Sequence, residues 1–141
     1  MNDKEINPTR ILLIQLRRIG DVLMTTPAVR AVKKRFPEAK ITFLTEPPSD
    51  EIFRHNPYVD EILLHARQWQ GMDYLRFIRN LRQRRFDLVI DFFGNPRSAQ
   101  LAFFSGVKYR LGFNFRGRRW LYTSKVSLPA DKNRYAPLHK L

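Results

Sequence analysis

Apolar residues follow two different spacings along this chain, and the two spacings alternate. Five short runs are almost continuously apolar, which is typical of strands that are covered on both faces of a sheet. The stretches between these runs carry apolar residues three or four positions apart, as in helices with one buried face. The predicted strands cover residues 10–16, 41–45, 61–65, 87–93 and 109–113.

The stretches between the strands predict helices over residues 22–36, 71–85 and 97–105. A further short helix is predicted within the segment 47–57, where Ser49 or Asp50 would cap it. Strands that alternate with helices require right-handed crossovers, which give a mostly parallel sheet. The predicted fold class is therefore α/β, a Rossmann-like sheet with flanking helices, and the basic stretch 114–125 is predicted to be a loop.

The start of the first helix has two interpretations. Pro27 either opens a helical segment that Thr26 caps, or kinks a helix that already begins at Asp21. In both cases Asp21 follows the first strand through Gly20, at the carboxyl edge of the sheet, where open α/β sheets bind ligands. Gly20 lets the chain turn tightly there and would also allow a ligand to approach the backbone. Asp21 is then either a helix N-cap or a carboxylate that can act as a base.

A second loop is predicted to open at the same edge. Gly94, Asn95, Arg97 and Ser98 follow the fourth strand directly. On the plain interpretation this is a strand-end turn in which Asn95 caps the next helix. On the functional interpretation Arg97 and Ser98 face the loop of Asp21 across one cleft, because neighbouring parallel strands open at the same edge. The chain has neither a GxGxxG nor a GxxxxGK[ST] run, so the common nucleotide-binding fingerprints are missing.

Length and composition exclude several classes of protein. At 141 residues, we expect one domain over 1–141 with a core of about 10–128. The chain has no cysteine and its three histidines lack ligand spacing, so we expect no metal. No apolar run approaches the ~20 residues of a membrane span, and the N-terminus does not resemble a signal peptide. These features predict a soluble, cytoplasmic protein.

The positive charge is unevenly distributed. Residues 1–66 hold ten Lys and Arg against nine Asp and Glu, whereas residues 67–119 hold twelve against three. The excess of positive charge in the second segment therefore predicts that it binds an anionic partner. Helix 71–85 and loop 114–125, with Trp69, Trp120 and Tyr122, either hold an anionic membrane surface, bind nucleic acid or are simply solvated. No recognition helix, zinc finger or RNP-like motif supports nucleic acid.

Two ordered blocks of the chain carry a family resemblance. In RILLIQLRRIGDVLMTTPAVR, residues 10–30, an apolar strand leads through Ile19-Gly20-Asp21 to a Thr-Thr-Pro-Ala helix. In FDLVIDFFGNPRSA, residues 86–99, a strand leads to a glycine and an Arg-Ser-Ala helix start, and GVKYRLGF follows at 106–113. Over about residues 10–113 the chain resembles the lipopolysaccharide heptosyltransferases, glycosyltransferase family nine.

This resemblance implies the N-terminal half of a two-domain GT-B enzyme. Such an enzyme would transfer heptose from ADP-heptose to the inner core of lipopolysaccharide, with inversion and without metal or cofactor. The first domain would bind the acceptor, and Asp21 would take the proton from its hydroxyl. The second, donor-binding domain is expected to be absent from this chain, which would then be inactive alone. The alternative is a non-catalytic module that binds an anionic glycan or nucleic acid.

The resemblance also implies where substrate binds and where the protein acts. Because the acceptor is a lipid-anchored saccharide, we expect a peripheral protein at the inner face of the inner membrane. Arg17 and Arg18 stand where many family members have small hydroxyl residues, and they either grip an anionic group or are solvated. The candidate substrate-binding residues are Arg17, Arg18, Gly20, Thr25, Gly94, Asn95, Arg97, Ser98, Arg116, Arg118 and Arg119.

Overall fold

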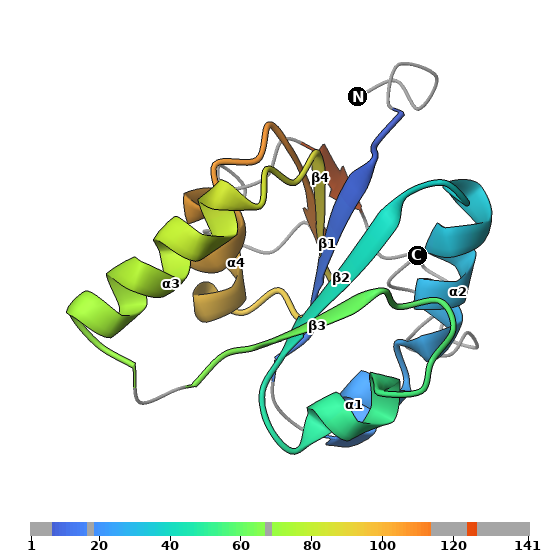
Figure 1. Cartoon of the computed structure of the whole chain (residues 1–141), viewed down its shortest axis with the longest axis horizontal. Coiled ribbons are helices and arrows are strands. Elements are labelled where there is room, and N and C mark those ends of the chain that lie inside the picture. The colour runs from blue at the N-terminus through green and yellow to red at the C-terminus, as the bar shows by residue number, and fades with distance from the viewer. Residues whose placement is uncertain (1–6, 17–18, 67–68, 114–123, 127–141) are drawn as a thin grey trace.

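A parallel sheet of six strands forms the centre of the molecule (Figure 1). The computed structural model describes residues 7–16, 19–66, 69–113 and 124–126. The strands stand in the order β3-β2-β1-β4-β5-β6, and every pairing is parallel. This confirms the predicted α/β class. The strands are β1 (Arg10–Ile14), β2 (Lys40–Thr45), β3 (Glu61–Leu64), β4 (Leu88–Asp91), β5 (Tyr109–Phe113) and β6 (Ser124–Val126).

Helices cover both faces of this sheet. Figure 1 shows α1 and α2 on one side of the strands and α3 and α4 on the other. Short crossovers place these helices between consecutive strands, as right-handed β-α-β connections require. The helices are α1 (Ile19–Leu23), α2 (Thr26–Arg35), the 3-10 helix η2 (Ser49–Phe53), α3 (Met72–Gln83) and α4 (Pro96–Phe104).

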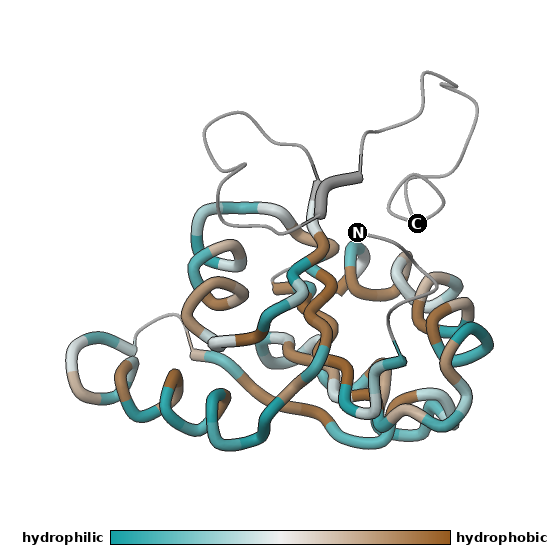
Figure 2. The backbone as a smooth tube through the Cα atoms, turned by 90° about the horizontal axis from the view of Figure 1, so that it is seen from above, coloured by the Kyte–Doolittle hydropathy of each residue, from teal (hydrophilic) through white to brown (hydrophobic). Residues whose placement is uncertain are grey.

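The core lies in two layers, one on each face of the sheet. Alternate residues of β1 serve the two layers: Ile11 and Leu13 pack on the α1–α2 side, and Leu12 and Ile14 pack on the α3–α4 side. All four are fully buried, which explains why this strand is apolar without interruption. Figure 2 shows the same distribution, with hydrophobic residues following the strands through the interior.

The first predicted helix is broken in two, and Pro27 lies at the start of a separate helical segment as the first interpretation predicts, but Thr26 does not cap it. α1 begins at Ile19, before Asp21, so Asp21 lies in the first turn and is not an N-cap. α2 begins at Thr26 itself, and Thr25 occupies the cap position. The hydroxyl of Thr25 donates to the carbonyl oxygen of Val22 at 2.6 Å, and its N–H donates to the same oxygen at 3.0 Å. These two bonds satisfy the end of α1 and separate it from α2.

Two further expectations need correction. η2 begins at Ser49 and neither Ser49 nor Asp50 caps it, because Pro48 holds the cap position. The carboxylate of Asp50 instead accepts a hydrogen bond from Arg54 at 2.9 Å. Ser124 and Lys125 were expected in a loop, but they belong to β6, which pairs with β5. A strand of three residues with two polar ones is too short to show a pattern, and residues 114–123 lie outside the described part of the chain.

None of the helices in the described ranges combines the length and the apolar composition that a membrane crossing needs.

Candidate functional site

The sheet reverses its winding direction between β1 and β4. From β1 the chain proceeds outward to β2 and β3, and from β4 it proceeds outward to β5 and β6 on the opposite side. The loops after β1 and β4 therefore diverge at the carboxyl edge, and the crevice between two such loops is where open α/β sheets bind ligands. Ile14 of β1 pairs with Asp91 of β4 at this edge. The two loops predicted to carry the chemistry start from these two strand ends.

On the β1 side, the crevice is flanked by the five-residue helix α1. Asp21 lies in its first turn with a half-exposed side chain, so its carboxylate can reach a ligand. Gly20 lies within this helix and has no positive φ, so the tight turn expected of it is not observed. A Cβ added at Gly20 would meet nothing within 4 Å, which leaves open space beside the backbone. Ile19 and Leu23 are exposed on the same helix and give this flank an apolar surface.

On the β4 side, two local hydrogen-bond systems fix the loop. The carboxylate of Asp91 accepts from the N–H groups of Phe93 and Gly94 at 2.9 and 3.0 Å. Gly94 has a φ of 70°, which favours glycine. Asn95 then caps α4: its side-chain oxygen accepts from the N–H of Ser98 at 2.8 Å, while the Ser98 hydroxyl accepts from the N–H of Asn95 at 3.0 Å. This capping box confirms the plain interpretation of Asn95.

The side chain of Arg97 extends from the first turn of α4 toward the ends of β2 and β3. Its Nη1 lies 3.7 Å from Oε1 of Glu46, the residue after β2. The same oxygen lies 3.7 Å from Nδ1 of His65, the residue after β3. Residues from three strand ends therefore meet at the carboxyl edge. Glu46 and His65 are 7% and 2% exposed, whereas the side chain of Arg97 is 36% exposed.

Burial determines the electrostatics of this cluster. It lowers the pKa of His65, and the positive charge of Arg97 acts in the same direction against the opposing effect of Glu46. His65 is therefore neutral at neutral pH. Tyr74 of α3 is also near: burial raises the pKa of its phenol, and Arg97 opposes this. The hydroxyl groups of Tyr74 and Thr45 are buried without a hydrogen-bond partner. We name Glu46, His65 and Arg97 the edge cluster.

Sequence reasoning missed Glu46 and considered His65 only as a metal ligand. A signal was present, since Glu46 follows a buried strand directly, as the segment of Asp21 follows β1. Among the residues that the structure describes, no three His, Asp or Glu side chains gather in a way that would hold a metal ion.

The predicted substrate-binding residues divide into three groups. Gly20, Gly94, Asn95, Arg97 and Ser98 all lie in the segments that directly follow β1 and β4, although the side chains of Asn95 and Ser98 are engaged in the capping box. Thr25 is buried and donates its hydroxyl within the chain, and its role in binding stays a prediction. The remaining five lie outside the described residues: Arg17, Arg18, Arg116, Arg118 and Arg119.

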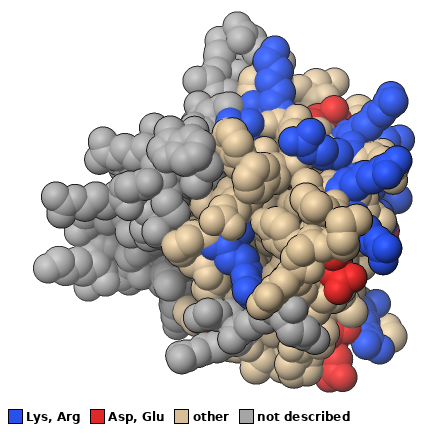
Figure 3. Space-filling view, turned by 90° about the vertical axis from the view of Figure 1, so that its left-hand side faces the viewer, with Lys and Arg blue, Asp and Glu red and all other residues tan. Residues whose placement is uncertain are grey.

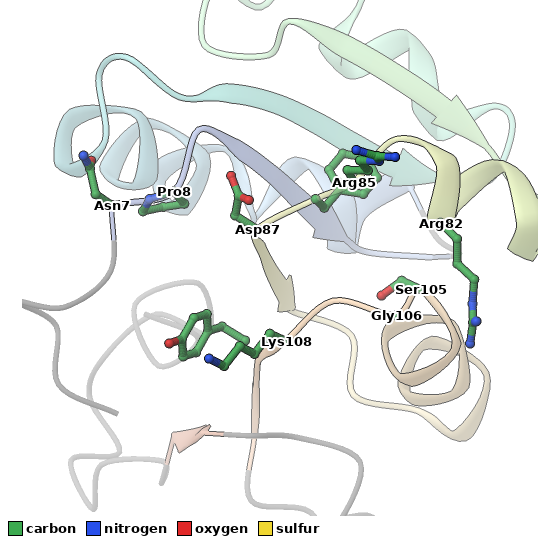
Figure 4. Close-up of a pocket in the computed structure, with 10 residues that line it drawn as sticks. Asn7, Pro8, Arg82, Arg85, Asp87, Ser105, Gly106 and Lys108 are labelled. Carbon is green, nitrogen blue, oxygen red and sulfur yellow. The ribbon is translucent and has the colours of Figure 1, made fainter.

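A cavity of about 510 Å³ lies at the opposite, amino edge of the sheet. Arg82 and Arg85 from the end of α3, Asp87 before β4 and Lys108 before β5 surround it (Figure 4). Arg82 donates through Nε to the carbonyl oxygen of Phe104 at 2.7 Å, at the end of α4. Cations are favourable at helix C-termini, where carbonyl groups lack partners. Because its lining residues stand before β4 and β5 and at the end of α3, this cavity is separate from the crevice at the carboxyl edge.

Comparison with known proteins identifies related sequences. Residues 74–137 match the family described as glycosyltransferase family 9 (heptosyltransferase). A Haemophilus influenzae protein that carries a glycosyltransferase name is 27% identical over 118 residues, which are 84% of this chain and 34% of that protein. Lipopolysaccharide heptosyltransferase 3 of Escherichia coli K12 is 31% identical over 81 residues, 54% of this chain and 24% of that protein. The chain thus spans about a third or less of the length of these relatives.

The fold also has solved counterparts. The structure of the Escherichia coli heptosyltransferase WaaC with ADP-2-deoxy-2-fluoro heptose superimposes with a TM-score of 0.73 at 21% identity. The match covers 93% of this chain and 45% of that one. At this identity the likeness establishes the arrangement of strands and helices.

Proposed function

Because residues 74–137 match glycosyltransferase family 9 and the chain aligns with part of a lipopolysaccharide heptosyltransferase, we propose that it belongs to this family and forms the acceptor-binding part of a heptosyltransferase. The enzyme would transfer heptose from ADP-heptose to the inner core of lipopolysaccharide. The names of the relatives support this substrate class, since one is a lipopolysaccharide heptosyltransferase and one solved structure contains an ADP-heptose analogue. The observation that best supports the proposal is that α1 and α4, the helices that carry Asp21 and Arg97, follow the neighbouring parallel strands β1 and β4.

In this reaction Asp21 is the general base. The bond between the anomeric carbon of heptose and the ADP oxygen breaks, and positive charge develops on that carbon. An acceptor hydroxyl attacks the opposite face and loses its proton to the carboxylate of Asp21, while ADP departs with the bonding electrons. Attack on the opposite face inverts the configuration. The half-exposed position of Asp21 at the edge of the crevice supports this role, because a base must come within hydrogen-bond reach of the hydroxyl.

Arg97 binds an anionic group of the acceptor. Guanidinium groups pair with phosphate and carboxylate through two parallel hydrogen bonds, so one arginine can fix both the position and the orientation of such a group. The capping box at Asn95 supports this role, since it fixes the first turn from which Arg97 projects. In this scheme neither a metal nor a cofactor takes part, and Gly94 and the open backbone at Gly20 line the path of the acceptor.

The outward face of α3 binds an anionic membrane surface. Met72 and Leu75 are 64% and 59% exposed, and Arg76 and Arg79 are exposed on the same helical stripe. Exposed apolar residues beside arginines are typical of helices that lie on anionic lipid. On the face of the molecule seen in Figure 3, Lys and Arg side chains outnumber Asp and Glu and gather along one side. The protein would thus act as a peripheral protein on the cytoplasmic side of the membrane that holds its acceptor.

Vesicle sedimentation tests this membrane surface. Replacing Arg76 and Arg79 with Glu should abolish binding to vesicles that contain anionic phosphatidylglycerol, because each Lys or Arg near such a surface contributes about 1 kcal/mol. The matched control reverses the charge of Lys34 and Arg35 at the exposed end of α2. Equal loss of binding in both double variants would mean that only net charge matters, and would exclude α3 as the specific surface.

A transfer assay tests the proposed activity. The native protein containing this chain is incubated with ADP-heptose and with lipopolysaccharide that lacks inner-core heptose, and the product is analysed by mass spectrometry. We expect a mass increase of one heptose and none with a nucleotide-activated hexose. Binding of the truncated lipopolysaccharide without any transfer would instead favour a non-catalytic module.

A further inference from the structure

Glu46 and His65, the two buried members of the edge cluster, have no role in the transfer described so far. Glu46 lies at its centre, between Arg97 and His65, and the three residues come from separate elements of the fold. A carboxylate that is removed from water is costly unless charged or polar partners compensate. The chain keeps this carboxylate nearly buried at the carboxyl edge of the sheet, where Gln15 and Thr45 are also buried.

His65 does not neutralise the charge of Glu46, so this charge attracts the guanidinium of Arg97. The ring of His65 is held edge-on by Trp69 at 5.7 Å and Phe77 at 5.4 Å between ring centroids. Because burial keeps His65 neutral, no imidazolium competes for the carboxylate. The distance of 3.7 Å between Nδ1 and Oε1 is also longer than a hydrogen bond. Arg97, whose Nη1 lies 3.7 Å from Oε1, is a cation that helps to balance the charge of Glu46.

We propose that Glu46 is a positioning residue, which holds the guanidinium of Arg97 in the orientation that receives an oxyanion of the acceptor. This inference rests on the proposed function in one respect, that Arg97 binds the acceptor. The contact between Nη1 and Oε1 is an ion pair at 3.7 Å, so the buried carboxylate attracts one edge of the planar guanidinium and favours the orientation in which that edge faces it. The carboxylate is buried, whereas 36% of the arginine side chain remains exposed and available to a ligand.

Steady-state kinetics of the native protein provides the first test. In Glu46→Gln, which preserves shape and removes charge, the KM for the lipopolysaccharide acceptor should rise roughly tenfold with kcat within about twofold. In an Arg97→Gln background the same substitution should add less than about twofold, because the two residues act as one unit. Glu38→Gln removes the same charge at an exposed position beyond the opposite edge of the sheet and should change neither constant. Independent, additive effects of Glu46→Gln and Arg97→Gln would overturn the proposal.

Nuclear magnetic resonance of the full chain provides a test that needs no activity. The Nε–H group of Arg97 should be rigid in the unaltered chain and mobile in Glu46→Gln, and Glu46→Asp, with its charge kept, should restore part of the rigidity. An Arg97 signal that is equally rigid in all three proteins would refute the positioning role. If the protein transfers no heptose, the proposed function fails, and this measurement still decides the role of Glu46.

Inorganic phosphate and acetate distinguish the two kinds of oxyanion. Inhibition of transfer by phosphate that weakens in both Glu46→Gln and Arg97→Gln would support a phosphate of the acceptor. The same result with acetate would support a carboxylate. Inhibition by either anion that is unchanged in Arg97→Gln would contradict the role given to the pair.

Discussion

Replacing Asn95 with Ala tests how firmly the first turn of α4 is fixed. The substitution removes the side-chain oxygen that accepts from the N–H of Ser98 at 2.8 Å. The reciprocal bond, from the backbone N–H of Asn95 to the Ser98 hydroxyl at 3.0 Å, does not need the Asn side chain and can survive. One of the two bonds of the capping box is therefore lost. Such a change at an N-cap costs about 1 kcal/mol, and for a chain of this size it lowers Tm by about 3–5 °C.

Urea unfolding followed by circular dichroism measures this cost, with the slope against urea expected to stay unchanged. Asn95→Asp keeps an oxygen acceptor at the cap and should remain within about 0.5 kcal/mol of the unaltered chain. Gln100→Ala, at an exposed position of the same helix, is the control for a loss of side-chain atoms. A stability of Asn95→Ala equal to that of the unaltered chain, or an Asp variant as unstable as the Ala variant, would refute the capping argument.

Two further predictions concern the ends and the centre of the sheet. Burial raises the pKa of Asp87, but hydrogen bonds from Thr9 and Arg10 outweigh it and the pKa is lowered, so this carboxylate stabilises the fold above about pH 4 and loses its effect as the pH falls through its folded pKa. The difference in unfolding free energy between the unaltered chain and Asp87→Asn should therefore shrink in acid, and a constant difference from pH 7 to pH 2.5 would contradict it. Phe43 is fully buried with its ring 4.1 Å from that of Phe53, so Phe43→Ala should cost about 3–5 kcal/mol in chemical unfolding. A loss below about 1.5 kcal/mol would show that the neighbouring side chains close the cavity.

The sheet could be predicted from the sequence because its strands are buried on both faces. Residues of β1 alternate between two apolar layers, so both sets must be apolar and the run is conspicuous. The three residues of β6 carry no such pattern, because at the edge of a sheet pairing depends on the strand beside it. The break between α1 and α2 could not be predicted from the sequence either. It depends on the hydroxyl of Thr25 satisfying a carbonyl of the preceding turn, a choice that helical spacing does not reveal.

The candidate site was predictable only where residues follow a strand closely in sequence. The loops of Asp21 and Arg97 were found because each follows an apolar run and both runs end at one edge. The contact between Arg97 and Glu46 joins residues that are far apart in the chain, and it depends on how α4 directs its first turn. His65 was considered only for metal spacing, although its burial beside Glu46 gives it a role in the electrostatics of the edge cluster. The spacing of residues along the sequence cannot predict contacts between side chains that follow three different strands.

The central claim is that Asp21 is the base of a heptose transfer at the carboxyl edge of the sheet, and the kinetics of Asp21→Asn test it most directly. The native protein is assayed with ADP-heptose and heptose-deficient lipopolysaccharide, beside Asp73→Asn, which makes the same change in the first turn of α3. Loss of a general base should lower kcat about 10²–10⁴-fold while the acceptor KM changes little, and Asp73→Asn should behave like the unaltered protein. An Asp21→Asn variant that keeps a tenth or more of the original kcat would contradict the account.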